Sequence, residues 1–155
     1  MEWGFLNVVL RAFGFNEKFV KLIQQCISTV RYSLLLNGSI FSTFYPSRGL
    51  RQEDPLSPYL FIIGSEVLLR LINREQSLGN LSGVKVAGNA QPITKLCYAD
   101  DVILFCKAKL QEVNSLVQCI DTYCEWFGQK VSIKKSGFFT SKGVHPQFKM
   151  QLKDS

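Results

Sequence analysis

The sequence contains a single histidine, His145, and its five cysteines include no Cys-x-x-Cys pair. A zinc site needs several closely spaced cysteine or histidine ligands, so this composition argues against a zinc protein. Charged residues make up only 19% of the chain and hydrophobic residues 46%, a balance that predicts a folded chain and not a disordered one. At 155 residues, we expect one domain with a sizeable core.

The chain also lacks a long uninterrupted apolar run. Its most apolar stretch, Leu56 to Ile72, contains the charged residues Glu66 and Arg70, so no membrane span is predicted. The first four residues, Met1 to Gly4, have neither the basic start nor the apolar core of a secretory signal. We therefore expect a reduced, intracellular protein without a membrane partner.

Positive charge is in excess, with a formal net charge of +6. The excess gathers toward the C-terminal end, where Lys130, Lys134, Lys135, Lys142, Lys149 and Lys153 stand against one acidic residue, Asp154. A basic tract of this kind predicts a polyanionic partner such as nucleic acid. A solvated tail that aids solubility explains the same charge equally well.

Hydrophobic periodicity predicts helices over about residues 3–13, 16–30, 59–73 and 110–127, the third of them central and buried. Asn37-Gly38 joins two apolar runs, residues 32–36 and 40–45, and is the strongest short-range hairpin signal in the chain. Further short strands are predicted near residues 84–86, 131–133 and 138–139. Helices laid on one face of a mostly antiparallel sheet define an α+β domain.

Asp100 and Asp101 lie between two strand-like runs, residues 93–97 and 102–106. This layout predicts a tight hairpin with a carboxylate pair at its tip. Adjacent aspartates repel each other, and their hard oxygens suit Mg²⁺, which shares its coordination sphere with substrate phosphates. The alternative is an ordinary turn, because aspartate tolerates turn geometry and favours solvent.

A polar segment, residues 46–58, carries Arg48, Arg51, Gln52, Glu53 and Asp54 within seven residues. Together with Tyr98-Ala99-Asp100-Asp101 farther along the chain, the segment Pro46 to Phe61 resembles the reverse transcriptase of non-LTR (LINE-type) retrotransposons, especially those of plants. The Asn37-Gly38 hairpin and residues 128–136 resemble that family in order and spacing.

The resemblance implies an RNA-directed DNA polymerase fragment over residues 1–143, followed by a basic tail over residues 144–155. The expected fold is a palm-like antiparallel sheet packed against helices, with part of the fingers, truncated before the first catalytic strand. The implied reaction is attack of a DNA primer 3′-hydroxyl on a deoxynucleoside triphosphate, directed by an RNA template and two Mg²⁺ ions. Other parts of a retrotransposon polyprotein would be partners, and the chromosomal target of such elements points to the nucleus.

Carried over residue by residue, the family motif makes Asp100 the better metal ligand and Asp101 its weaker neighbour. Tyr98 would lie under the primer end, although a half-buried strand aromatic is the alternative. Lys135 would neutralise or protonate the departing pyrophosphate. A solvated turn lysine is the alternative there, and Lys134 beside it leaves the assignment uncertain by one residue.

The same resemblance places four residues of the polar segment against the substrate. Gln52 would lie beside the incoming nucleotide, and Arg48 and Arg51 would pair with phosphates through their guanidinium groups. Gly49 would let the backbone pass close to nucleic acid. Ion pairing of the two arginines with the acidic residues that follow them is the alternative.

The chain departs from the family at several points. The family carries another metal-binding aspartate on a strand just upstream of Glu2, and this sequence starts at Met1. Glu53 occupies a family glycine position and adds bulk and negative charge near the expected phosphates, and Ser132 replaces an asparagine. We therefore expect the isolated chain to lack useful polymerase activity. A non-catalytic nucleic-acid-binding remnant and a non-functional decayed fragment are the alternatives.

Overall fold

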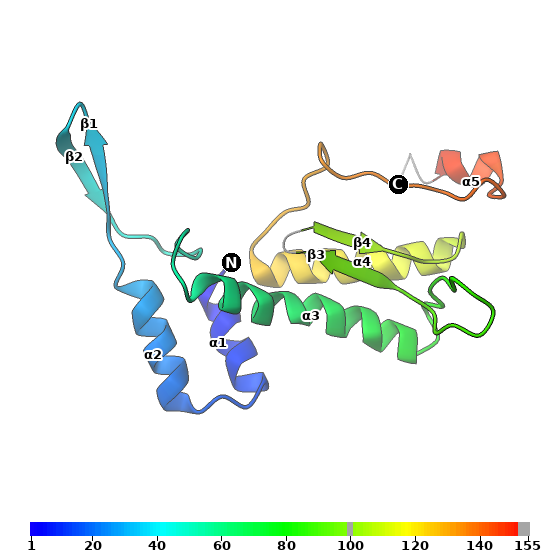
Figure 1. The fold of residues 1–155 in the computed structure, drawn as a ribbon, viewed down its shortest axis with the longest axis horizontal. Helices are drawn as coiled ribbons and strands as arrows, with labels where there is room; N and C mark the ends of the chain where they lie inside the picture. Colours follow the sequence, from blue (N-terminus) through cyan, green and yellow to red (C-terminus); the bar gives the residue numbers. More distant parts are fainter. Residues whose placement is uncertain (99–100, 152–155) are drawn as a thin grey trace. The chain divides into compact units, whose positions relative to one another are not determined.

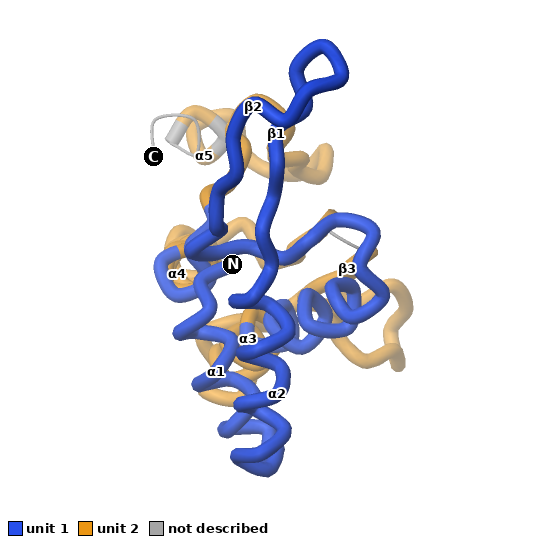
Figure 2. The backbone as a smooth tube through the Cα atoms, turned by 90° about the vertical axis from the view of Figure 1, so that its left-hand side faces the viewer, with its two compact units in different colours: residues 1–67, 125–129 blue, residues 68–124, 130–155 orange. Residues whose placement is uncertain are grey.

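The structure is a computed structural model and describes residues 1–98 and 101–151. These residues form five helices and two two-stranded antiparallel sheets, which is the predicted α+β class (Figure 1). The chain divides into two compact units (Figure 2). Unit 1 comprises residues 1–67 and 125–129, and unit 2 comprises residues 68–124 and 130–155.

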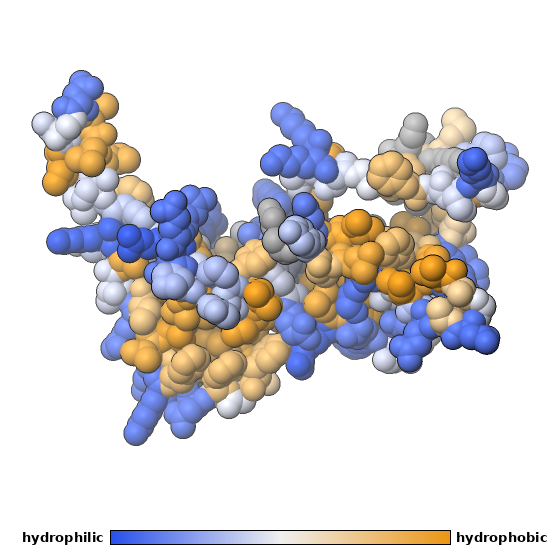
Figure 3. Space-filling model, in the orientation of Figure 1, coloured by the Kyte–Doolittle hydropathy of each residue, from blue (hydrophilic) through white to orange (hydrophobic). Residues whose placement is uncertain are grey.

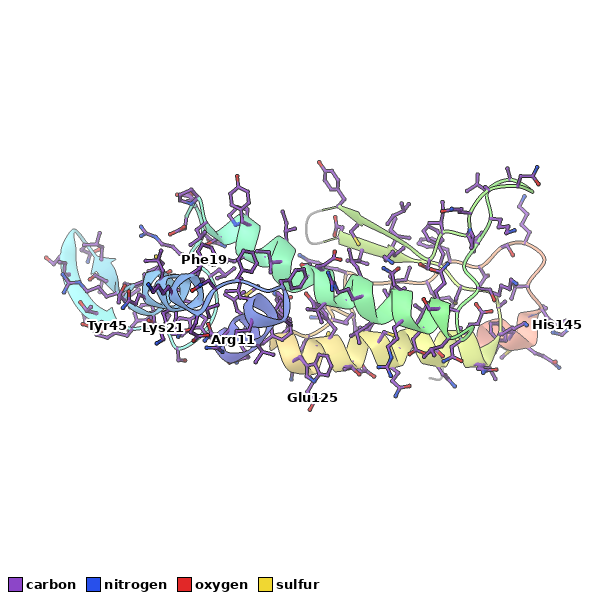
Figure 4. The ribbon with its side chains drawn as sticks, turned by 90° about the horizontal axis from the view of Figure 1, so that it is seen from below. Arg11, Phe19, Lys21, Tyr45, Glu125 and His145 are labelled. Atoms are coloured by element: carbon purple, nitrogen blue, oxygen red, sulfur yellow. The ribbon has the colours of Figure 1, made fainter. Side chains whose placement is uncertain are left out.

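Unit 1 begins with the helices α1 (Trp3–Ala12) and α2 (Glu17–Ser28), close to the predicted bounds. Gly14 follows α1 with a φ of +83°, a left-handed conformation that glycine adopts at little cost. Asn16 caps α2, because its side-chain oxygen accepts a hydrogen bond from the Lys18 N–H at 2.8 Å. Arg11 of α1, labelled in Figure 4, forms an exposed ion pair with Glu17 at the start of α2.

The core of unit 1 centres on Phe127, whose side chain is fully buried. Its ring meets the rings of Phe5 and Phe61 edge to face, with centroid distances of 5.4 and 6.0 Å. Gly64 is packed closely against this cluster, since a Cβ atom there would lie 2.7 Å from the Phe127 ring. The aromatic cluster therefore leaves room for glycine alone at position 64.

The strands β1 (Tyr32–Leu36) and β2 (Ser39–Phe44) form the predicted hairpin. Asn37 and Gly38 both have positive φ angles, +49° and +81°, as expected for the turn type that Asn-Gly favours. Large apolar side chains on the hairpin are exposed, among them Leu35 at 70% and Phe41 at 74% (Figure 3). The β1–β2 hairpin of unit 1 therefore leaves most of its apolar side chains exposed to solvent.

Helix α3 (Ser57–Ser77) is longer than predicted. Leu60, Leu68 and Ile72 are buried, but Tyr59 and Ile62 are 66% and 64% exposed. The prediction of a helix buried on most sides is therefore wrong for its first turns. Residues 57–67 belong to unit 1 and residues 68–77 to unit 2.

Unit 2 contains β3 (Lys95–Tyr98), β4 (Asp101–Leu104) and most of α4 (Leu110–Phe127). The strands pair antiparallel, with Tyr98 opposite Asp101. Leu81, Leu116 and Tyr123 are buried in this unit. Helix α4 has the predicted bounds. The predicted hairpin is present, but its strands differ from the predicted runs by one or two residues, so Asp101 belongs to β4 and not to the tip.

Three of the predicted short strands did not form as such. The strand near residues 84–86 is a single bridge between Val84 and Ile93, and residues 131–133 and 138–139 are not strands. The lysine-rich segment instead makes a local turn, in which the N–H groups of Lys135 and Ser136 bond the Ser132 carbonyl. Local bonds therefore replace the ladder that a strand would need.

The segment after this turn contains the short helix α5 (Pro146–Gln151), which the sequence pattern does not predict. His145 immediately precedes it (Figure 4). Among the described residues, no helix is both long and apolar enough to cross a bilayer.

Candidate functional site

The loop between β2 and α3, residues 45–56, carries four of the predicted site residues. Arg48, Arg51 and Gln52 are exposed, and Gly49 is partly buried between them. The Gly49 N–H donates to the Met1 carbonyl at 2.8 Å, and the Gly49 carbonyl accepts from the Trp3 indole N–H at 2.7 Å. The start of α1 thus holds both backbone polar groups of this glycine.

Gly49 has a φ of +89°, and a Cβ built there would have no atom within 4 Å. The left-handed backbone, and not crowding within this chain, explains glycine at this position. Arg48 lies 3.4 Å from the Glu2 carboxylate in an exposed ion pair, a contact of little energy. The alternative partners, Glu53 and Asp54, form no ion pair with either arginine in the described part of the chain.

The end of the loop is fixed by Asp54. Its side-chain Oδ1 accepts the Leu56 N–H at 2.8 Å, and its carbonyl accepts the Ser57 N–H at 3.1 Å. These bonds satisfy two donors just before and at the start of α3. The exposed stretch Arg51 to Glu53 therefore lies between two anchored points, Gly49 and Asp54.

Glu53 has a φ of +62°, which is unusual for a residue with a side chain. By its resemblance to the family, the sequence has Glu53 at a position where glycine is expected. A left-handed backbone at position 53 gives that preference a physical reason, since glycine alone adopts it without a steric cost. The structure therefore adds a conformational feature at Glu53 to the negative charge that the sequence shows.

A pocket of about 110 Å³ borders the loop. Trp3, Tyr32 and Ile27 line it, together with Gly49, Arg51 and Leu56 of the loop. All of these residues belong to unit 1. The loop therefore borders a small, partly apolar recess with guanidinium groups at its margin.

The β3–β4 hairpin of unit 2 carries the other predicted site residues. Tyr98 is 84% exposed and faces Asp101, the exposed first residue of β4. Asp100 lies outside the described residues. Within residues 1–98 and 101–151, no three His, Cys, Asp or Glu side chains gather as metal ligands. Asp101 offers carboxylate oxygens of the kind that Mg²⁺ prefers.

Lys135 is exposed in the turn of residues 133–135, and Lys134 beside it is exposed too. Both lie in unit 2, as does the β3–β4 hairpin, whereas the loop of residues 45–56 lies in unit 1. The structure therefore gathers Arg48, Gly49, Arg51 and Gln52 in one loop, and Tyr98 and Asp101 at one end of a hairpin.

Glu112 was not singled out from the sequence, yet it joins the segments on both sides of the hairpin. It is 5% exposed in the first turn of α4. Its carboxylate accepts the N–H groups of Ser82 and Lys107, each at 3.1 Å, and the Ser82 hydroxyl at 2.9 Å. Its position three residues into a helix was the available signal, because a glutamate there commonly bonds backbone N–H groups before the helix.

The surroundings of Glu112 act on its pKa in two directions. Burial by itself would raise the pKa, but the three hydrogen bonds and the positive charge of Lys107 outweigh it. The pKa of Glu112 is therefore lower than usual, and the carboxylate is ionised at neutral pH. Burial also raises the pKa of the nearby Cys106 thiol, with a contribution from the Glu112 charge.

Comparison with known proteins shows one family and several relatives that this chain is similar to. Residues 1–150 match the family described as reverse transcriptase (RNA-dependent DNA polymerase). An uncharacterized mitochondrial protein of Arabidopsis thaliana is 51% identical over 67 residues, which are 43% of this chain and 55% of that protein.

Two retrovirus-related Pol polyproteins are also similar. The polyprotein from the type-1 retrotransposable element R2 of Popillia japonica is 30% identical over 118 residues, 76% of this chain and 18% of the polyprotein. That from the type-2 retrotransposable element R2DM of Drosophila melanogaster is 38% identical over 102 residues, 65% of this chain and 9% of the polyprotein. The match thus spans 55% of the Arabidopsis protein and less than a fifth of either polyprotein.

Proposed function

Because the chain belongs to the reverse transcriptase (RNA-dependent DNA polymerase) family, we propose that it supplies the substrate loop and the metal hairpin of an RNA-directed DNA polymerase. The observation that carries this proposal is the loop of residues 45–56. It exposes Arg48, Arg51 and Gln52 while its backbone is anchored at Gly49 and Asp54. Exposed donors on a fixed backbone suit a phosphate-bearing ligand, because little order must be gained on binding.

In this proposal Arg48 and Arg51 bind phosphate groups, and Gln52 contacts the incoming deoxynucleoside triphosphate through its amide. Gly49, which has no side chain, would let the backbone pass close to the nucleic acid. Each arginine has an exposed guanidinium and, at most, one weak ion pair to give up. Neither would have to break a buried contact to reach a phosphate.

The metal hairpin would use Asp100 and Asp101 as ligands of Mg²⁺. When bound, the two ions supply charge neutralisation at the attacking and leaving oxygens of the transfer. Tyr98, exposed beside Asp101, would support the primer end through its ring. Lys135 would neutralise the negative charge of the departing pyrophosphate or donate a proton to it.

The partners of this activity would be an RNA template, a DNA primer and the remaining parts of a retrotransposon polyprotein. Residues 1–143 would form part of the palm and fingers, and residues 144–155 a basic tail. The short coverage of the Pol polyproteins favours a role within a longer polypeptide, because much of their length lies outside the match.

A nucleic-acid-binding module without chemistry is the second candidate. The net charge of +6 favours binding whether or not catalysis follows. Glu53, with its negative charge beside the phosphate-binding arginines, opposes nucleotide binding more than it opposes contacts with a long polyanion. Both candidates predict binding of nucleic acid. Only the polymerase candidate predicts a reaction, and that reaction would require Asp100.

Equilibrium binding of an RNA–DNA hybrid with a recessed primer tests the loop's role. We expect the slope of log affinity against log salt to fall by about one for each of Arg48→Ala and Arg51→Ala, because each removes one phosphate contact. Lys21→Ala, on α2 of the same unit (Figure 4), is the matched control and should leave the slope unchanged. Equal slopes for all four proteins would contradict the proposed loop.

A further inference from the structure

Gly49 is the one loop residue whose two backbone polar groups are both bonded to the start of α1. The acceptor of its N–H is the Met1 carbonyl, and the donor to its carbonyl is the Trp3 indole. The second contact is 2.7 Å long, partly buried, and joins residues 46 positions apart. An indole N–H can only donate, so the Gly49 carbonyl fully satisfies it.

Packing alone holds this part of the loop weakly. Gly49 and Arg51 border the pocket of about 110 Å³ that Trp3 also lines. Backbone next to a recess has fewer dispersion contacts than backbone in a filled core. Glycine at position 49 adds conformational freedom, because it has more accessible backbone conformations than any other residue. Hydrogen bonds must therefore supply much of the order in this turn.

We propose that Trp3 is a positioning residue for the substrate loop. Its indole N–H fixes the carbonyl of Gly49 and thereby sets the directions in which Arg48 and Arg51 leave the loop. This inference rests on the proposed function of the loop. Trp3 itself touches no substrate; it acts through the peptide that joins the two phosphate-binding residues.

Trp3→Phe tests the proposal, because it keeps an aromatic ring and removes the N–H. Trp126→Phe is the matched control, since Trp126 lies on α4 and is 49% exposed. Trypsin reports on the loop without any ligand, because it cleaves after Arg48 and Arg51. Cleavage after Lys142, an exposed residue of unit 2, provides the internal reference.

We expect Trp3→Phe to accelerate cleavage after Arg48 and Arg51 about tenfold, equivalent to about 1.4 kcal/mol, relative to cleavage after Lys142. The same variant should bind the RNA–DNA hybrid less tightly at fixed salt, whereas Trp126→Phe should match the wild type in both assays. Unchanged loop cleavage would overturn the proposal, as would equal acceleration at all three sites, because the latter reports global destabilisation. Faster loop cleavage with unchanged hybrid affinity would overturn it too.

The test separates this proposal from the function on which it rests. If the wild-type protein fails to bind the hybrid, the proposed function falls, while the cleavage ratio still decides whether Trp3 orders the loop. If Trp3→Phe does not fold, hydrogen exchange of the indole N–H groups of the wild type decides instead. The Trp3 indole N–H, bonded to the Gly49 carbonyl, should then exchange at least tenfold more slowly than the indole N–H of the 49% exposed Trp126, and equal rates would overturn the proposal.

Discussion

Glu53 has a backbone conformation that suits glycine, with a φ of +62° on an exposed loop. The left-handed region costs an ordinary residue about 1–2 kcal/mol. Glycine avoids this cost but loses more chain entropy on folding, by about 0.4–1 kcal/mol. For Glu53→Gly, relief of the steric cost raises the free energy of unfolding and the extra loss of chain entropy lowers it. The steric contribution is the larger of the two.

Glu53→Gly should therefore raise the free energy of unfolding by about 0.5–1 kcal/mol. Urea denaturation measures the change, with Gln52→Gly as the control at the neighbouring position. Gln52 has no positive φ, so glycine there brings only the entropic loss and should lower stability. A Glu53→Gly protein less stable than the wild type would refute the conformational explanation.

Glu112 links stability to pH. Its folded-state pKa is lower than the ordinary value of 4.5, so its stabilising effect is complete above that value. The effect is then lost as pH falls through the folded-state pKa, because protonation removes the acceptor charge. Glu112→Gln should cost about 2 kcal/mol near neutral pH, since two backbone N–H groups lose a charged acceptor.

Urea denaturation of the wild type and Glu112→Gln across the acidic range measures this link. The stability difference should be constant above pH 4.5 and shrink below it, following the titration of this one carboxylate. Glu125→Gln is the control and should leave the stability unchanged across the same range, because its carboxylate is exposed on α4 and belongs to the other unit. If the difference in unfolding free energy between the wild type and Glu112→Gln stays the same at low pH, ionisation of Glu112 does not contribute to stability.

Substitution of Gly64 in helix α3 by alanine would have two opposing effects on stability. Alanine improves helix propensity by up to about 1 kcal/mol, but overpacking a filled core costs about 1–3 kcal/mol. A Cβ at position 64 would lie 2.7 Å from the Phe127 ring and 2.9 Å from the Met1 Cε atom. Phe127 is fully buried and cannot readily move, so the packing cost should dominate.

Gly64→Ala should accordingly lower the melting temperature, whereas Gly4→Ala on α1 should raise it. Position 4 has no atom within 4 Å of a built Cβ, so only the propensity gain applies there. Thermal unfolding followed by circular dichroism measures both. Stabilisation by both substitutions would mean that the aromatic cluster does not restrict position 64.

Helices α1 to α4 and the two hairpins followed from local signals, whereas helix α5 and the absence of the weaker strands did not. Asn16 and Gly14 mark helix ends, and Asn37-Gly38 marks a turn, by chemistry that operates within a few residues. Residues 131–133 have strand-like side chains but pair with no strand among the described residues, and a local turn forms at residues 132–136 instead. Pairing partners depend on tertiary arrangement, which residue preference does not encode.

In the candidate site, groups of residues that are close in sequence could be predicted, whereas contacts between residues far apart in sequence could not. The loop and the hairpin were identifiable because their residues are close in sequence, as are Arg48 to Gln52 and Tyr98 to Asp101. The contacts of Trp3 with Gly49 and of Glu112 with Ser82 join residues 46 and 30 positions apart. Long-range hydrogen bonds of this kind leave no local pattern, and only the structure revealed them.

RNA-templated extension of a DNA primer in Mg²⁺ is the most direct test of the central claim. It should use a longer retrotransposon polypeptide that contains residues 1–155, because the isolated chain is expected to lack activity. The comparison is with its Asp100→Asn variant and with Asp121→Asn, an exposed aspartate of α4, as the control. We predict extension by the parent and the control, and a loss of several powers of ten in Asp100→Asn, each worth about 1.4 kcal/mol of barrier. Equal extension by the parent and Asp100→Asn would contradict the account.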